Sequence, residues 1–202
     1  MACQPTRAFR RGIPEIELKL SATMHHVDFA REDVDFAIRH GAGNWPGLDA
    51  VNLTAEELFP VCSPSLMTSR GGIHEPEDVL RFPLLHLDDR FDWSRWLEAA
   101  GASGEGLLHG PILNHASMLI DAAIDGQGIA LARTMLASSD LIAGRLVRPF
   151  QVALPLKNTY WIICPKATRS LPKIIAFRDW LLEEVDTDRQ KLAAATSAQT
   201  VR

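Results

Sequence analysis

The chain has 202 residues, of which 47% are hydrophobic and 23% are charged, and this balance excludes wholesale disorder. The formal net charge of −4 argues against a surface built mainly to grip nucleic acid or anionic lipid. No apolar run approaches the roughly 20 residues that a membrane-spanning helix needs, and the first residues lack the apolar core of a signal peptide. We therefore expect a cytoplasmic globular protein with no membrane partner.

The three cysteines, Cys3, Cys62 and Cys164, are odd in number and widely spaced. This pattern fits neither a disulfide framework nor a zinc site. Cys62 and Cys164 lie in apolar segments that we expect to be buried strands, where a thiol is usually an inert small hydrophobe. The sequence predicts no metal site and no cofactor.

Short elements of both kinds alternate before Pro64. Residues 7–11 have the pattern of a last helical turn that Gly12 ends, and alternating apolar and charged residues predict a strand over 15–21. A short helix around 26–31, a strand over 34–38, a loop over 41–47 and a strand over 57–63 are expected to follow.

The alternation restarts after Pro64, which favours an α/β fold with mostly parallel sheets. Helices are predicted near 65–69 and 77–80, over 93–100 and 116–125, from Thr134, and from Pro172. Strands are predicted over 83–87, at 111–114, over 129–132, around Leu146 and over 159–164. From Asp186 the chain is polar and alanine-rich without a periodic face, so we expect a disordered tail over 186–202.

Two similar strand ends, at 61–64 and 163–165, bracket an α/β block of typical domain size. A chain that leaves one lobe, builds another and returns would have two connecting strands and a cleft between the lobes. The alternative is a single doubly wound sheet in which those strands are neighbours.

In open α/β sheets, ligands bind beyond the carboxyl ends of the strands, beside helix N-termini. This rule selects polar residues after the predicted strands. The candidate ligand-binding residues are Ser21, Thr23, Arg39, His86, Asp88, Asn114, Ser117 and Arg133.

Each candidate also has a structural interpretation. Asn114 or Ser117 is predicted to cap the helix beginning at Ala116, which would leave backbone N–H groups aimed at an anion or would merely satisfy the helix itself. Arg39 and Arg133 suit a carboxylate partner, or else structural ion pairs. A catalytic role for His86 with Asp88 is the weaker interpretation, because a lone His–Asp pair is more often a loop hydrogen bond.

Enzyme motifs are absent from the sequence. No Gly-x-Gly-x-x-Gly follows a strand, and no phosphate-binding P-loop, Gly-x-Ser-x-Gly elbow or His-Glu-x-x-His occurs. Trp93 and Trp96 have the spacing of a buried helix face. The chain is therefore predicted to bind a ligand and not to be an enzyme.

Four segments together resemble the effector-binding domain of LysR-type transcriptional regulators, most strongly the branch of the glycine cleavage system activator. They are Val-Asp-Phe-Ala-Ile-Arg-His-Gly at 34–41, Gly-Asn-Trp-Pro-Gly at 43–47, Glu-Leu-Phe-Pro-Val-Cys-Ser-Pro at 57–64, and 114–130, which begins Asn-His-Ala-Ser and ends Gly-Gln-Gly-Ile-Ala. The resemblance covers about residues 7–185.

The resemblance implies a type II periplasmic-binding-protein-like fold, in which two Rossmann-like lobes joined by two crossover strands hold a small effector in the cleft. It implies lobe I at 13–62 plus 163–185 and lobe II at 63–162. The hinge would comprise Val61, Cys62, Ser63, Trp161, Ile163 and Cys164. Dimerisation through the lobe edges is a further expectation from the family.

The sequence departs from the family pattern at its start. Only twelve residues, which would be the remnant of a helix, precede Ile13. We therefore expect a truncated regulator whose near lobe lacks its first strand and which would bind DNA only if a helix-turn-helix were restored. The rival interpretations are a solute-binding protein of a transport system and a small α/β enzyme using His86 and Asp88.

Overall fold

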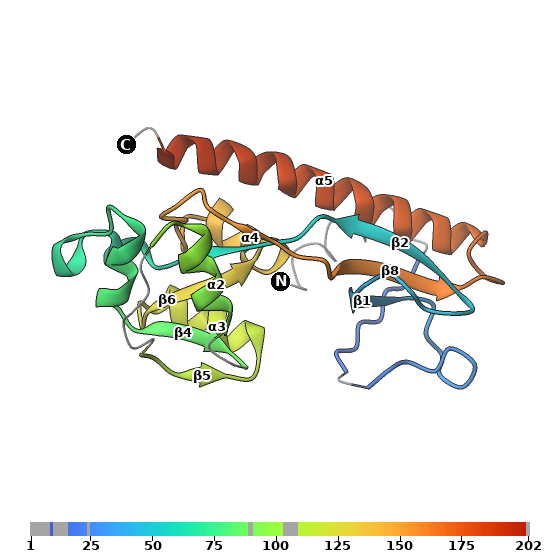
Figure 1. Cartoon of the computed structure of the whole chain (residues 1–202). Coiled ribbons are helices and arrows are strands. Elements are labelled where there is room, and N and C mark those ends of the chain that lie inside the picture. The colour runs from blue at the N-terminus through green and yellow to red at the C-terminus, as the bar shows by residue number, and fades with distance from the viewer. Residues whose placement is uncertain (1–8, 10–15, 24, 89–90, 103–108, 201–202) are drawn as a thin grey trace. The chain divides into compact units, whose positions relative to one another are not determined.

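The structure is a computed structural model that describes residues 9, 16–23, 25–88, 91–102 and 109–200 (Figure 1). The chain divides into two compact units. Unit 1 comprises residues Met1–Ala55 and Lys157–Thr187, and unit 2 comprises Glu56–Leu156 and Asp188–Arg202. The chain thus passes between the units at 55–56, at 156–157 and, within its last helix, at 187–188. The first two passages lie seven and six residues before the predicted boundaries.

Unit 1 contains a three-stranded sheet in the order β1-β8-β2, formed by β1 (Ala37–Gly41), β8 (Thr159–Pro165) and β2 (Leu48–Thr54). Both pairings are antiparallel, so the prediction of mostly parallel sheets is wrong for this unit. Strand β2 was not predicted, because Asp49 and Asn52 interrupt its apolar pattern. Ile162, Ile163 and Cys164 of the central strand are buried.

The long helix α5 (Pro172–Thr200) begins in unit 1 at the predicted proline (Figure 1). Its Ile174 is buried and borders a small cavity with Val51 and Ile162, so the start of α5 packs on one face of the sheet. Residues 188–200 continue the helix, which corrects the prediction of a disordered tail after 186. Alanine runs carry high helix propensity, which the absence of a periodic face does not cancel.

Three other predictions for the start of the chain need correction. Residues 16–23 form no strand in the structure, and Leu20 is 57% exposed. The segment 26–31 contains a turn in place of a helix, with the Arg31 N–H donating to the Asp28 carbonyl. Most of the predicted helix end at 7–11, and Gly12, lie outside the described residues. Phe9 is described, is helical, and is completely buried.

Unit 2 is a mixed five-stranded sheet in the order β5-β4-β6-β3-β7. Its strands are β3 (Glu57–Val61), β4 (Leu84–Leu87), β5 (Ile112–Leu113), β6 (Ile129–Arg133) and β7 (Leu154–Pro155). Strands β5, β4 and β6 are parallel, whereas β3 runs antiparallel to β6 and β7. The predicted strand around Leu146 is reduced to an isolated bridge between Cys62 and Val147.

Helices cover both faces of this sheet. They are α2 (Phe91–Ala99), α3 (Ala116–Ile124) and α4 (Thr134–Ile142), with the short 3-10 helices η1 (Pro64–Met67), η2 (Ser69–Gly71) and η3 (Pro76–Arg81). One core cluster holds Leu84 with Trp93 and Trp96, and a second holds Leu85 with Leu119. Because successive strand residues point to opposite faces, neighbouring leucines serve two different cores.

Candidate functional site

Unit 2 brings its polar strand ends together where the three parallel strands finish. Leu87, Leu113 and Arg133 are the last residues of β4, β5 and β6, and the N-termini of α2, α3 and α4 follow within a few residues. This edge of the sheet is where an open α/β fold binds ligands.

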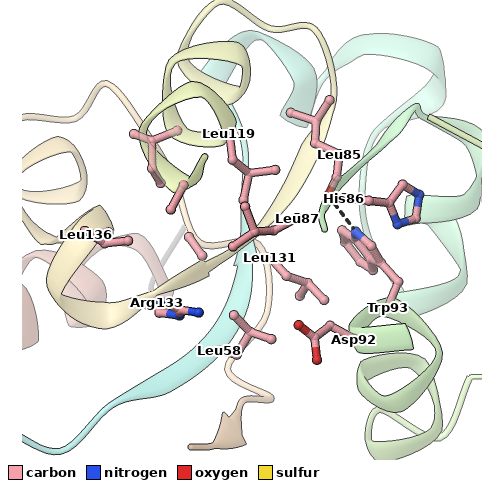
Figure 2. A pocket seen from close by; sticks show the side chains of 13 residues that line it. Leu58, Leu85, His86, Leu87, Asp92, Trp93, Leu119, Leu131, Arg133 and Leu136 are labelled. Atoms are coloured by element: carbon pink, nitrogen blue, oxygen red, sulfur yellow. Dashed lines mark hydrogen bonds between the residues drawn. The ribbon is translucent and has the colours of Figure 1, made fainter. Parts of the chain in front are cut away.

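A pocket of about 30 Å³ opens at this edge (Figure 2). Its wall is mostly apolar and comes from the strands β3, β4 and β6 and from the helices α2, α3 and α4. The lining residues are Leu58, Leu85, His86, Leu87, Asp92, Trp93, Ala116, Leu119, Ile120, Leu131, Ala132, Arg133 and Leu136. A cavity of this volume holds about two water molecules, so it admits one small polar group.

Three side chains give the pocket its polar character. Arg133 is half-buried at the end of β6, and in the view of Figure 2 its guanidinium and the Asp92 carboxylate flank Leu58. His86 is only 1% exposed and also lines the wall. Trp93 is fixed beside it by a hydrogen bond of 3.1 Å from its Nε1 to the Leu85 carbonyl. A cation and an anion thus border one apolar pocket.

The N-terminus of α3 carries no side-chain cap. His115 is the N-cap residue and makes no capping hydrogen bond, and the Ser117 hydroxyl lies 3.0 Å from the His115 Nδ1. The prediction that Asn114 or Ser117 caps this helix is therefore wrong. Because Ala116 lines the pocket, the partial positive charge of this helix end faces it.

A buried carboxylate occupies the N-terminus of α4. Glu56 Oε1 accepts a hydrogen bond of 3.1 Å from the Met135 N–H, and the Glu57 N–H donates to the Thr134 hydroxyl at 3.1 Å. Burial raises the pKa of Glu56 to about 7, although the bond from Met135 and the charge of Arg133 act in the opposite direction. This helix end is anion-binding in character, and its anion belongs to the protein.

The three unit 1 candidates lie on a more open surface. Ser21 and Thr23 are exposed, and the Thr23 hydroxyl donates to the His25 carbonyl at 3.4 Å. Arg39 on β1 donates to the same carbonyl at 2.8 Å. Within unit 1, Thr23 and Arg39 thus meet at His25. Glu32 lies against this group, and the Asp28 N–H lowers the pKa of its carboxyl.

The unit 2 candidates separate into two sets. His86 and Arg133 line the pocket, whereas Asp88, Asn114 and Ser117 are exposed beside it, at the strand ends and the first turn of α3. Asp88 has a left-handed backbone with φ of 61°, which carries its side chain away from the strand alternation. The cleft that would join the unit 1 and unit 2 candidates stays a prediction.

Sequence reasoning missed Asp92 and Glu56. Asp92 is in the first turn of α2, and the rule applied to the other strands could have selected it. Glu56 offered no such signal, because a glutamate before a strand is ordinarily exposed. Its burial depends on α4, which lies 79 residues further along the chain.

The predicted hinge residues do not lie at the passages between the units. Val61 and Cys62 are buried within unit 2, while Trp161, Ile163 and Cys164 belong to the central strand of unit 1. Ser63 precedes η1, also within unit 2. The passages at 55–56 and 156–157 are linked where the Leu156 N–H donates to the Glu56 carbonyl at 3.0 Å.

Two features of other protein classes are missing from the described ranges. Among those residues, no group of three or more His, Cys, Asp or Glu side chains is arranged to hold a metal ion. Within the same part of the chain, no helix combines the length and apolarity needed to cross a bilayer. Cys62 and Cys164 are buried free thiols, and burial raises the pKa of Cys62 to about 12, as expected for an inert side chain.

The sequence of this chain is similar to those of known transcriptional activators. The glycine cleavage system transcriptional activator of Escherichia coli strain K12 is 40% identical over 184 residues, which are 91% of this chain and 60% of that protein. The HTH-type transcriptional activator AmpR of Enterobacter cloacae is 35% identical over 178 residues, or 88% of this chain and 60% of that protein. The chain thus spans about 60% of the length of these curated relatives.

Solved structures show the same relationship. The effector domain of AmpR from Pseudomonas aeruginosa has a TM-score of 0.70 at 30% identity, over 93% of this chain and 89% of that one. The AmpR effector binding domain from Citrobacter freundii has a TM-score of 0.71 at 30% identity, over 90% of both chains. The fold is the α/β, type II periplasmic-binding-protein-like fold. The model of the LysR substrate binding domain matches residues 4–186, and the chain belongs to this family.

Proposed function

We propose that this chain is the effector-sensing part of a LysR-type transcriptional regulator and that unit 2 holds the carboxylate of a small metabolite. The observation that carries the proposal is the pocket at the carboxyl ends of β4 and β6, where Arg133 and the uncapped N-terminus of α3 provide positive charge. Arginine and helix N–H groups are the donors that carboxylates prefer.

The same pocket favours an amino acid within that class. Asp92 lines the same pocket as the cationic Arg133 and, within the described residues, is paired at 3.5 Å with Arg95 through Oδ1 only, so its carboxylate retains an acceptor for the ammonium group of a zwitterion. Since the cavity holds only about two water molecules, the ionic head would enter it and the remainder would lie at the mouth. The 40% identical relative is named for the glycine cleavage system, which makes glycine the first probe.

The proposed activity is binding without turnover. A ligand changes the state of a regulator only to the extent that it binds one state more tightly than another. We propose that occupancy of the pocket is passed in this way to a DNA-binding part of the helix-turn-helix type named for the AmpR relatives. The buried His86 and the exposed Asp88 give the alternative of a small α/β enzyme little support.

Thermal unfolding in the presence of a ligand panel tests the proposal. The panel pairs each carboxylate with its neutral amide, so that glycine is compared with glycinamide and acetate with acetamide. We expect stabilisation by the carboxylates, because a ligand at about 100 times its Kd stabilises by about 2.7 kcal/mol, and none by the amides. Equal shifts with acids and amides, or no shift with any carboxylate, would contradict the proposal.

A further inference from the structure

Glu56 is a buried carboxyl group with unused hydrogen-bonding capacity. The residue is 2% exposed, its Oε1 accepts the Met135 N–H, and its backbone carbonyl accepts the Leu156 N–H. Within the described part of the chain, Oε2 has no hydrogen-bond partner. Burying an ionised oxygen without a partner is costly, so burial shifts this side chain toward its neutral form.

Arg133 connects Glu56 to the pocket. Arg133 ends β6 directly before α4, lies opposite Leu58 in the sheet, and acts electrostatically on the Glu56 carboxyl. The same residue lines the pocket. The positive charge of Arg133 would therefore stabilise both a ligand carboxylate and the ionised form of Glu56.

The other charged groups near Glu56 interact with partners other than Glu56 and Arg133. Glu57, beside it on β3, is exposed and acts on Arg148, whose guanidinium lies 4.1 Å from the centre of the Phe59 ring. Asp140, the titratable residue of α4, accepts hydrogen bonds from Arg145. Strand β7, which pairs with β3, contributes no ionisable side chain. Neutralisation of Arg133 is thus the change of charge that we expect to raise the pKa of the Glu56 carboxyl.

We propose that the ionised fraction of Glu56 takes up a proton from solvent when a carboxylate ligand binds at Arg133, so that ligand affinity rises as the pH falls. The inference rests on the proposed function of the pocket. A ligand that neutralises Arg133 removes part of what keeps Glu56 ionised. By linkage, protonation of Glu56 removes a negative charge that competes for Arg133, so the ligand carboxylate binds Arg133 more tightly.

The burial of Glu56 places this exchange near neutrality, since the pKa of the carboxyl is already about 7. His86 lines the same pocket and His115 lies at the adjacent helix end. Histidine is the side-chain type that ordinarily changes charge between pH 5 and 8. An experiment must therefore separate Glu56 from the histidines.

The first test follows the side-chain carboxyl carbon of Glu56 by NMR against pH in the full chain. Its titration midpoint should lie near 7 and move upward when glycine saturates the protein. Arg133→Gln, which mimics neutralisation by a ligand, should move the midpoint upward without any ligand, whereas Glu57→Gln should leave it in place. An unchanged midpoint in Arg133→Gln would overturn the inference.

The second test measures glycine affinity from about pH 5.5 to 8.5, where the glycine carboxylate stays ionised. The association constant should rise toward acid by about tenfold for each unit by which the ligand raises the pKa of Glu56. Glu57→Gln should keep this profile and Glu56→Gln should flatten it. A pH profile that persists in Glu56→Gln assigns the proton to a histidine. This result overturns the inference about Glu56 but leaves the proposed function of the pocket standing. Absence of binding by glycine and acetate in every variant overturns the proposed function, and the inference with it.

Discussion

Glu56 and Met135 are 79 residues apart in the chain, yet the Glu56 carboxylate accepts the Met135 backbone N–H at 3.1 Å. This contact places a buried acid at the first turn of α4, next to the arginine of the candidate pocket. It makes the stability of unit 2 dependent on the protonation of one side chain.

Protonation of Glu56 should therefore make a pH-dependent contribution to the free energy of unfolding, and Glu56→Gln should remove this contribution. Burial raises the pKa of Glu56 from 4.5 to about 7, so the folded state binds the proton more tightly than the unfolded state does. This stabilisation is fully present below about pH 4.5 and is lost as the pH rises through about 7. It amounts to at most about 3 kcal/mol, at 1.36 kcal/mol per pKa unit.

Denaturant unfolding of both proteins at several pH values checks this prediction. The difference in stability between wild type and Glu56→Gln should move in favour of the variant from about pH 5 to pH 8. Taking the difference cancels the titration of the seven histidines. A difference that stays constant over this range would show that Glu56 titrates normally.

Phe9 should be important for the stability of unit 1. Its ring is completely buried, with its centroid 5.3 Å from that of Phe177 and 4.9 Å from that of Trp180. Phe9→Ala should cost about 3–5 kcal/mol, as for other buried phenylalanines, whereas Leu20→Ala should cost less than about 0.5 kcal/mol. Leu20 is the control because it is 57% exposed. The losses are measured by denaturant unfolding. Equal losses in the free energy of unfolding for the two variants would indicate that the segment 15–21 is packed, as the predicted strand required.

Gly43 and Gly47 offer a matched pair in the loop between β1 and β2. Both have left-handed backbones, with φ of 86° and 84°, so alanine is strained at either position. A methyl group on Gly43 would overlap the Trp161 indole, whereas Gly47 has open space. Gly43→Ala should therefore be at least about 1 kcal/mol less stable than Gly47→Ala, the usual cost of overpacking. Trp161 fluorescence should change only in the first variant, and identical behaviour would contradict the packing described here.

The sequence predicted unit 2 well because its elements carry strong local patterns. Ile129–Ala132 is an unbroken apolar run and Ala116–Ile124 has a helical apolar face, and a strand and a helix appear at these predicted positions. His86 and Arg133 were selected by the rule that ligands bind at strand ends; both line the pocket, and their binding of an effector stays a prediction. These predictions needed only the period of the pattern and the position of the strand ends.

The predictions that were wrong depend on contacts distant in the chain. The segment 15–21 has a strand pattern, yet a strand needs a partner, and the described sheet of unit 1 pairs β1 and β2 with β8 instead. Glu56 is buried by elements far from it in the sequence, and no local pattern marks it. Pairing and burial are tertiary properties, which periodicity alone does not determine.

The most direct test of the central claim is the affinity for glycine of the wild-type chain, Arg133→Gln and Arg31→Gln, measured by calorimetry at pH 7. Arg31 is the matched control because its side chain is 87% exposed in unit 1. Loss of a charge-assisted hydrogen bond costs about 1.5–3 kcal/mol, so Arg133→Gln should weaken binding by about 10- to 100-fold while Arg31→Gln binds as wild type does. Equal affinity in all three proteins would show that the carboxylate does not bind at Arg133 and would contradict the account.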